Sequence, residues 1–145
     1  MTKFAQGKFQ IKNIEKYIGK KTPTYRSSWE FAMMTMLDNN PAILQWASEP
    51  FFVPYRNPFN GRNTFYVPDF LMVYVDKNGK KHADIVEVKP KRETKLEHAG
   101  RSKKAQYAAV LNAAKWQAAS AWCKANGFTM KIVTEEQLFF QGKKK

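Results

Sequence analysis

The stretch TFYVPDFLMVYVDKNGKKHADIVEVK, residues 64–89, decides the fold of this chain. It contains two runs, 64–75 and 80–89, that are rich in the β-branched and aromatic residues typical of strands. Between them lies Asp-Lys-Asn-Gly, residues 76–79, a segment typical of a tight turn. The pattern predicts a β-hairpin.

Three charged residues lie on this hairpin at positions where their side chains could form one catalytic site. Glu87 and Lys89 are two residues apart, so on a strand their side chains point to the same face, while the Val88 side chain points to the other. Asp69 lies on the first run, directly after Pro68. Whether Asp69 joins the other two depends on how the strands are paired.

The length of the turn sets that pairing. A two-residue turn would leave the two carboxylates on different faces of the hairpin. A three-residue loop at 77–79, with Gly79 in the left-handed conformation, sets Asp69 opposite Glu87. We predict the three-residue loop, or a compensating bulge near Pro68.

Two carboxylates that face each other predict a metal site. Directly opposed residues lie about 4.5–5.5 Å apart at Cβ, so two opposed carboxylates can bind one cation. Without a cation they would repel each other. Phosphodiester cleavage uses a divalent cation to activate water and to neutralise charge on the phosphate, and Mg²⁺ prefers carboxylate and carbonyl oxygens. The pair therefore suggests metal-dependent hydrolysis rather than a structural role.

The residues around the hairpin predict two helices and a further strand. Apolar residues recur at helical spacing in 28–39 and 105–126, and Gly127 follows the second helix. A strand at 128–133, reached through that helix, would lie parallel to 80–89. The expected fold is α/β, with a mixed β-sheet flanked by helices.

Shorter segments are expected to complete the domain. They are an apolar piece at 43–46, an edge strand at 51–55, a polar turn at 57–63, a mobile charged loop at 91–104 and a last turn at 135–140.

Length and charge restrict the organisation and the partners. The 145 residues fit one domain, and we divide them into a basic N-terminal arm at 1–24, a domain at 25–140 and a basic tail at 141–145. The formal net charge of +13 favours a polyanionic partner, above all nucleic acid. An anionic membrane is the competing explanation, but no apolar run approaches the roughly 20 residues that span a bilayer. We expect the chain in the cytoplasm, or in a particle assembled there.

The motifs resemble the PD-(D/E)XK nuclease superfamily. Pro68-Asp69 and Glu87-Val88-Lys89 match its signature, and Glu30 on the preceding helix matches an additional acidic residue of many members. The resemblance implies a restriction-endonuclease-like fold in 25–140. It also implies that Asp69, Glu87 and the Val88 carbonyl bind Mg²⁺, for which Mn²⁺ can substitute, and that Lys89 acts on the attacking water.

Glu30 has a second explanation. Ser27-x-x-Glu30 is also a capping box, in which the two side chains satisfy backbone groups at the start of a helix. A capping role and a metal-binding role are compatible, and both stay open.

A closer resemblance covers nearly the whole chain. Its motifs are Tyr25-Arg-Ser-Ser-Trp-Glu30, Gln45-Trp-Ala-Ser-Glu49, Val53-Pro-Tyr-Arg-Asn-Pro58, Tyr66-Val-Pro-Asp-Phe70, Asp76-Lys-Asn-Gly-Lys80, Glu87-Val-Lys-Pro90 and Ala114-Lys-Trp-Gln-Ala118. They are similar to the head completion proteins of T-even-like contractile-tailed phages. That family implies action after genome packaging and before tail attachment, a place at the head-neck vertex of the virion, and portal or neck proteins as partners.

Basic residues near the hairpin are candidates for DNA contact because phosphate contacts supply most nonspecific affinity. They are Arg26, Arg56, Arg62, Lys91, Arg92, Lys95, Arg101, Lys103 and Lys104. A solvated surface is the alternative for each one alone, whereas DNA contact is favoured for the cluster after Lys89. Lys115 could reach the active site from the long helix, although a surface lysine is favoured. Tyr55, Phe65 and Tyr66 are expected in the core, unless they form an exposed patch that docks a portal or neck protein.

Three functions remain in competition. The first is a Mg²⁺-dependent endonuclease or end-processing nuclease that acts on double-stranded or branched DNA. The second is a non-catalytic connector that binds the packaged DNA end or the portal, although a connector has no physical need for two adjacent carboxylates. The third is a general nucleic-acid-binding module, which the basic tails would dominate.

Overall fold

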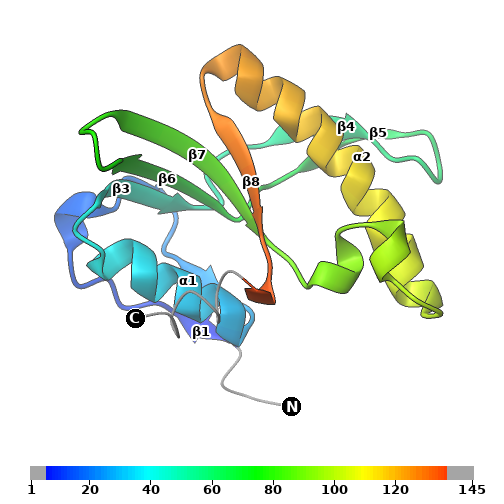
Figure 1. The fold of residues 1–145 in the computed structure, drawn as a ribbon, viewed down its shortest axis with the longest axis horizontal. Helices are drawn as coiled ribbons and strands as arrows, with labels where there is room; N and C mark the ends of the chain where they lie inside the picture. The colour runs from blue at the N-terminus through cyan, green and yellow to red at the C-terminus, as the bar shows by residue number, and fades with distance from the viewer. Residues whose placement is uncertain (1–5, 137–145) are drawn as a thin grey trace.

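The fold centres on a four-stranded mixed β-sheet, as expected (Figure 1). The computed structural model describes residues 6–136. The strands lie in the order β3 (Ile43–Ser48), β6 (Phe70–Val75), β7 (Lys81–Val88) and β8 (Thr129–Val133). Strand β6 is antiparallel to both β3 and β7, and β8 runs parallel to β7. The α/β prediction is confirmed, including the parallel strand reached through the long helix.

One helix packs on each face of this sheet. On α1 (Ser28–Asn39), Leu37 packs in one core cluster with Phe70 and Val86. On α2 (Lys103–Asn126), Cys123 packs with Ile85 in another cluster on the opposite face. Because alternate residues of β7 point to opposite faces, the two clusters separate by parity along that strand.

The hairpin of β6 and β7 has the register that the sequence predicted. Phe70 pairs with Val86 and Val75 pairs with Lys81. Gly79 has a φ of +80°, and its amide donates to the carbonyl of Asp76 at 2.9 Å. The three-residue loop with a left-handed glycine is therefore present, and extending the register by one residue sets Asp69 opposite Glu87.

The run 64–75 is not one strand, which corrects the sequence prediction. It divides into β5 (Asn63–Tyr66) and β6, and β5 pairs with β4 (Val53–Arg56) in a separate two-stranded sheet. Proline has no amide hydrogen, so Pro68 cannot donate to a sheet ladder and the chain changes direction there. The edge strand expected at 51–55 is thus β4, and it forms a hairpin that packs on α2.

The expected N-terminal arm packs on the domain from Gln6 onward. The short strands β1 (Gly7–Lys8) and β2 (Thr24–Tyr25) pair with each other, and a 3-10 turn, η2 (Ile14–Lys16), lies between them. Phe9 is buried against α1 and the sheet. Buried Asp38 accepts the backbone amide of Lys12 at 2.8 Å.

The charged loop expected at 91–104 contains two 3-10 helices, η3 (Lys91–Glu93) and η4 (Leu96–His98), before Ser102 caps α2. Asn112 on α2 donates to the Glu93 carbonyl at 3.1 Å and anchors this segment. Most of the last turn expected at 135–140, and the tail at 141–145, lie outside the described residues.

Gly127 ends α2 in the left-handed conformation, with a φ of +82°. Across residues 6–136, no helix combines the length and the apolar character that crossing a membrane requires.

Candidate active site

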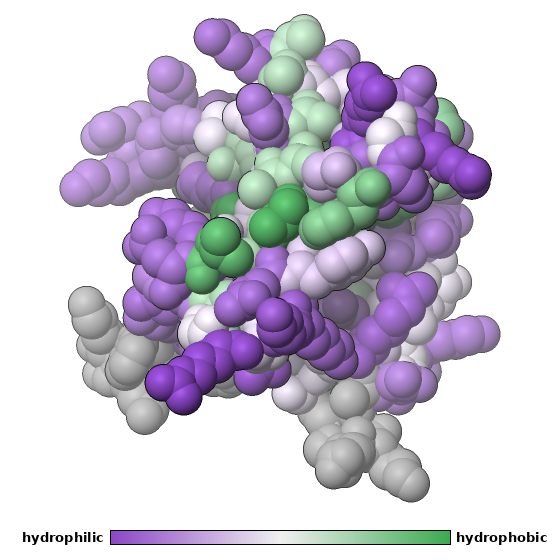
Figure 2. Space-filling view, turned by 90° about the vertical axis from the view of Figure 1, so that its right-hand side faces the viewer, coloured by the Kyte–Doolittle hydropathy of each residue, from purple (hydrophilic) through white to green (hydrophobic). Residues whose placement is uncertain are grey.

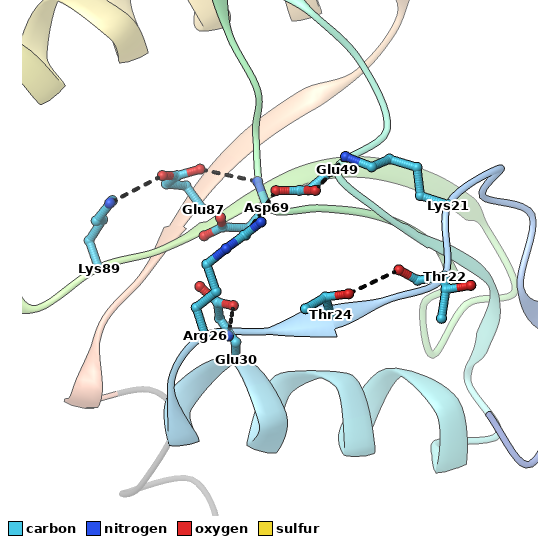
Figure 3. Close-up of polar contacts among 9 residues, drawn as sticks. All are labelled: Lys21, Thr22, Thr24, Arg26, Glu30, Glu49, Asp69, Glu87 and Lys89. Carbon is cyan, nitrogen blue, oxygen red and sulfur yellow. Dashed lines mark hydrogen bonds and ion pairs between the residues drawn. The ribbon is translucent and has the colours of Figure 1, made fainter. Parts of the chain in front are cut away.

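Asp69 and Glu87 meet where the β6–β7 hairpin opens (Figure 3). Asp69 lies one residue before β6, and Glu87 lies on the next-to-last residue of β7. The Asp69 amide donates to Glu87 Oε1 at 3.2 Å, and the Val88 amide donates to Asp69 Oδ2 at 2.8 Å. The structure therefore brings together the two carboxylates that the sequence singled out.

Both carboxylates lie where a negative charge is unfavourable. Burial raises the pKa of Asp69 well above its ordinary value, and the nearby charge of Glu87 raises it further. Burial likewise raises the pKa of Glu87, whose side chain is only 4% exposed. Such a pair is destabilised when both groups are ionised, unless a cation lies between them.

Lys89 and Tyr66 complete the immediate surroundings of Glu87. The Lys89 ammonium lies 3.9 Å from Glu87 Oε2, on the same face of the strand as predicted. The Tyr66 hydroxyl donates to Glu87 Oε1 at 2.6 Å, and burial raises the pKa of Tyr66 far above its ordinary value. The prediction that Tyr66 is in the core is correct, but its hydroxyl is also part of the site.

Glu30 forms the predicted helix cap and also lies near the pair (Figure 3). The Ser27 hydroxyl accepts the Glu30 amide at 3.1 Å, while Glu30 Oε1 accepts the Arg26 amide at 2.8 Å. The Glu30 charge contributes to the raised pKa of Asp69. The capping role is present, and the carboxylate lies close enough to Asp69 to act on it electrostatically.

Two further residues lie near the site, and the sequence favoured neither of them for it. Lys115 on α2 lies with its ammonium 5.7 Å from the centre of the Tyr66 ring. Burial lowers the pKa of Lys115, as does the neighbouring charge of Lys89. The favoured interpretation, an ordinary surface lysine, is wrong, and the alternative that Lys115 faces the site from the long helix is the one that the structure shows.

Glu49 is the second unexpected residue. Its amide donates to the Asp69 carbonyl at 2.8 Å, and its φ of +48° lies in the left-handed region that non-glycine residues rarely adopt. Its carboxylate accepts Lys21 at 2.7 Å and Arg26 at 3.1 Å. The only sequence signal for Glu49 was its place in one of the motifs shared with the phage family.

The carboxylate oxygens at this site are suitable ligands for a hard divalent cation. Hydrogen bonds among the described residues reach Asp69 Oδ2 and Glu87 Oε1, which leaves Asp69 Oδ1 and Glu87 Oε2 for a metal. Within residues 6–136, no group of three or more His, Cys, Asp or Glu side chains is placed to hold an ion. A metal here would therefore need backbone or water oxygens in addition to the pair.

The basic residues predicted to bind DNA do not form one cluster. Arg26 lies beside the carboxylates but pairs with Glu49. The Arg56 side chain donates to the Gly61 carbonyl at 3.0 Å, near the tip of the β4–β5 hairpin, and Arg62 is exposed in the same turn. Lys91 follows β7 directly and pairs with Glu136 at 3.0 Å.

The other basic candidates lie on η3, around η4 and at the start of α2. They are Arg92, Lys95, Arg101, Lys103 and Lys104. Figure 2 shows hydrophilic side chains around an apolar strip on this side of the molecule. Leu96 and Val110 are exposed apolar residues of η4 and α2.

Comparison with known proteins agrees with this geometry. The model of the family described as "TnsA-like endonuclease N terminal" matches residues 40–135, a range that contains Asp69, Glu87 and Lys89. The chain belongs to this family of PD-(D/E)XK-like nucleases.

A curated relative extends the similarity beyond that range. The chain is similar to the "Head completion nuclease" of Enterobacteria phage T4, with 36% identity over 142 residues. The similarity covers 91% of this chain and 92% of the phage protein, so it extends to the segment that carries Glu30. The predicted resemblance is confirmed.

Proposed function

We propose that this protein is a divalent-metal-dependent deoxyribonuclease that cuts DNA during the completion of phage heads. The observation that carries the proposal is the buried pair of Asp69 and Glu87, with the Lys89 ammonium 3.9 Å from Glu87. A connector without turnover gains nothing from two facing carboxylates whose pKa values are raised by burial.

The two carboxylates would hold Mg²⁺, or Mn²⁺ in its place, with help from the Val88 carbonyl. When bound, the ion would lower the pKa of a water molecule and neutralise charge on the phosphate. The Tyr66 hydrogen bond fixes one oxygen of Glu87 and turns the other toward Lys89. Lys89 would orient or deprotonate the attacking water and stabilise negative charge in the transition state.

Glu30 would act on the site from α1 as a metal ligand through water rather than directly, since no three acidic side chains among residues 6–136 are placed to hold one ion. Its Oε1 is occupied by the Arg26 amide, which leaves Oε2 for that contact. Its negative charge beside Asp69 also strengthens the attraction of the site for a cation.

Lys115 is a further residue that we assign to this reaction. Its ammonium reaches the carboxylate pair from α2, whereas Lys89 reaches it from β7. Because burial disfavours its charge, Lys115 would gain by pairing with a phosphate oxygen of the DNA. Together, the two lysines would hold the scissile phosphate over the carboxylates.

The nine basic candidates would contribute nonspecific phosphate contacts. Lys91 and Arg92 follow the active strand directly, while the residues of the hairpin tip and of the first turn of α2 would contact DNA farther from the cut. Double-stranded or branched DNA is the proposed substrate.

The biological setting follows from the phage T4 relative, whose name describes head completion. We assign this chain to the same stage, after genome packaging, with portal or neck proteins as its partners. It would work in the host cytoplasm during assembly and then remain at the head-neck vertex of the virion. A nuclease there would trim the packaged DNA end.

A cleavage assay tests this proposal. The parent should cut linear, circular or branched DNA with Mg²⁺ or Mn²⁺ and should stop in chelator. Asp69→Asn and Lys89→Met should each lower the cutting rate by about 10²-fold or more. The exposed Glu97→Gln and Lys124→Met variants are matched controls that should cut like the parent. Absence of metal-stimulated cutting on every DNA form would overturn the proposal.

A further inference from the structure

Two phenylalanines at the β4–β5 hairpin, Phe52 and Phe65, are exposed, although the sequence favoured core packing for Phe65. Phe65 is 65% exposed and Phe52 is 71% exposed. Their ring centres are 6.3 Å apart and their planes are nearly perpendicular. The expectation that Phe65 is buried is therefore wrong, because alternate residues of β5 point to opposite faces and Tyr66 takes the buried face.

Phe52 also forms one wall of a pocket of about 510 Å³. The pocket lies between residues 18–21, the end of β3 and the start of β6, and its walls include Ile18, Lys20, Lys21, Glu49, Phe52 and Leu71. We call it the Phe52 pocket. Aromatic and aliphatic side chains supply much of its lining, and two lysines supply its positive charge.

The Phe52 pocket and the proposed catalytic centre are neighbours through Glu49. Glu49 lines the pocket and donates its amide to the Asp69 carbonyl, as Figure 3 helps to follow. Phe65 points away from the face on which Tyr66 meets Glu87, and it is linked to the pocket through its ring contact with Phe52. A strand of DNA that extends from the carboxylates past Glu49 would reach the pocket and then the two rings.

We propose that Phe52, Phe65 and the Phe52 pocket bind unpaired nucleotides of the DNA next to the cut. Exposed aromatic faces bind bases by stacking, and lysines beside them bind the backbone, which together define a single-strand site. A base paired within a duplex cannot present its face to these rings. The preferred substrate would thus carry an unpaired segment beside the cleavage position, and this inference rests on the nuclease function proposed above.

Charge favours a nucleotide over an apolar protein segment as the occupant. Lys21 pairs with Glu49, but Lys20 has no acidic partner among residues 6–136. Arg56, two residues after Pro54, points to the same side of β4 as Pro54, which pairs with Phe65. The net charge of the whole chain, +13, adds a general attraction for a polyanion.

Binding measured in chelator separates this inference from catalysis. Fluorescence anisotropy would compare a fully paired duplex with the same duplex bearing a single-stranded extension. The parent should bind the extended DNA more tightly, and Phe65→Ala or Phe52→Ala should each reduce that preference by about fivefold or more. Phe65→Tyr should restore the preference, whereas Phe65→Leu, which is apolar but has no ring, should not.

Phe59→Ala is the matched control, because Phe59 lies on the same hairpin and is 49% exposed but stacks on Tyr107. It should leave the preference as in the parent. A 2-aminopurine base in the extension should be quenched by the parent and less by Phe65→Ala. Thermal unfolding of each variant checks that it is folded.

The outcomes distinguish the two proposals. If the parent neither binds nor cuts any DNA, the nuclease function itself fails. If the parent cuts DNA but binds duplex and extended DNA equally, only the unpaired-nucleotide site fails. A ring substitution that weakens both DNAs equally, or that leaves both unchanged while weakening binding to a partner protein, would also overturn this site.

Discussion

Two buried acidic residues on β7, three positions apart, have opposite surroundings. Asp84 is 1% exposed on the α1 face of the sheet, and Lys131 pairs with it at 2.8 Å. Glu87 is 3% exposed on the other face, beside Asp69, and its lysine is 3.9 Å away. One negative charge is neutralised within the protein, whereas the other is placed next to a second negative charge.

The difference separates a structural acid from a functional one. Asp84 raises the pKa of Lys131, so that pair stabilises its own charges. Near Glu87, burial and Lys89 lower the pKa of Lys115, while burial raises the pKa of Glu87 itself. Charges that the folded protein leaves uncompensated are available to a metal and a phosphate.

The largest difference in cutting rate is expected between two variants, Glu87→Gln and Asp84→Asn, which each replace a buried acid by its amide. Glu87→Gln should lower the cutting rate by about 10²-fold to 10⁴-fold, since it would remove a proposed metal ligand beside Lys89, the proposed catalytic lysine. Asp84→Asn should leave the rate nearly unchanged and lower the free energy of unfolding by about 1 kcal/mol. Steady-state cleavage and urea unfolding of both variants measure this. Equal loss of cutting in both would remove the distinction.

The lysines near these acids, Lys115 beside Glu87 and Lys131 beside Asp84, should differ in the same way, with a smaller effect on the cutting rate. Lys115→Met should lower the cutting rate by about tenfold to 10²-fold through loss of a phosphate contact. Lys131→Met should keep the rate but lower the free energy of unfolding by about 2 kcal/mol, because it leaves Asp84 buried without its partner. If Lys115→Met raises only the KM on long DNA and spares kcat, Lys115 is a general DNA-binding residue instead.

Metal and pH should change the stability of the functional pair. Because the folded-state pKa values of Asp69 and Glu87 are raised, the folded protein holds protons that the unfolded chain has lost. In chelator, the free energy of unfolding should therefore fall as the pH rises from about 4 through the folded-state pKa values. Glu87→Gln should flatten this dependence in a chemical unfolding series.

Mg²⁺ should reverse that loss, by about 1.4 kcal/mol at a free concentration ten times its dissociation constant. Glu87→Gln should remove most of the gain, whereas Asp84→Asn should keep it. Equal stabilisation of both variants by Mg²⁺ would place the metal elsewhere.

The register of the β6–β7 hairpin was predictable because its turn residues decide it. Gly79 selects the loop, the loop sets the register, and the register sets Asp69 opposite Glu87. The ends of α1 and α2 are likewise set by nearby capping residues, Ser27 and Gly127 among them.

The parts that sequence reasoning missed depend on contacts between distant segments. Phe9 and Tyr17 have no periodic pattern, yet both pack on Trp46, so the segment around them belongs to the core. Lys115 and Tyr66 reach Glu87 only because α2 and β5 dock beside β7. No local rule of the sequence encodes such tertiary contacts.

The smallest effect is expected at Glu49, which lies near the functional pair but resembles Asp84 in being neutralised. Lys21 and Arg26 lower its pKa, and these partly exposed ion pairs contribute little stability. Its left-handed φ of +48° is the larger factor. Glu49→Gly should be about 1 kcal/mol more stable than Glu49→Ala, since glycine has no Cβ to strain.

Comparison with Asp69→Asn completes this test. In chelator, Asp69→Asn should raise the free energy of unfolding above that of the parent, because the substitution removes an uncompensated buried charge. Glu49→Ala, which removes a compensated charge, should lower it. Urea unfolding at neutral pH measures whether each substitution raises or lowers the free energy of unfolding. The same sign for both would mean that proximity to the site, rather than the lack of a compensating charge, determines the stability of these carboxylates.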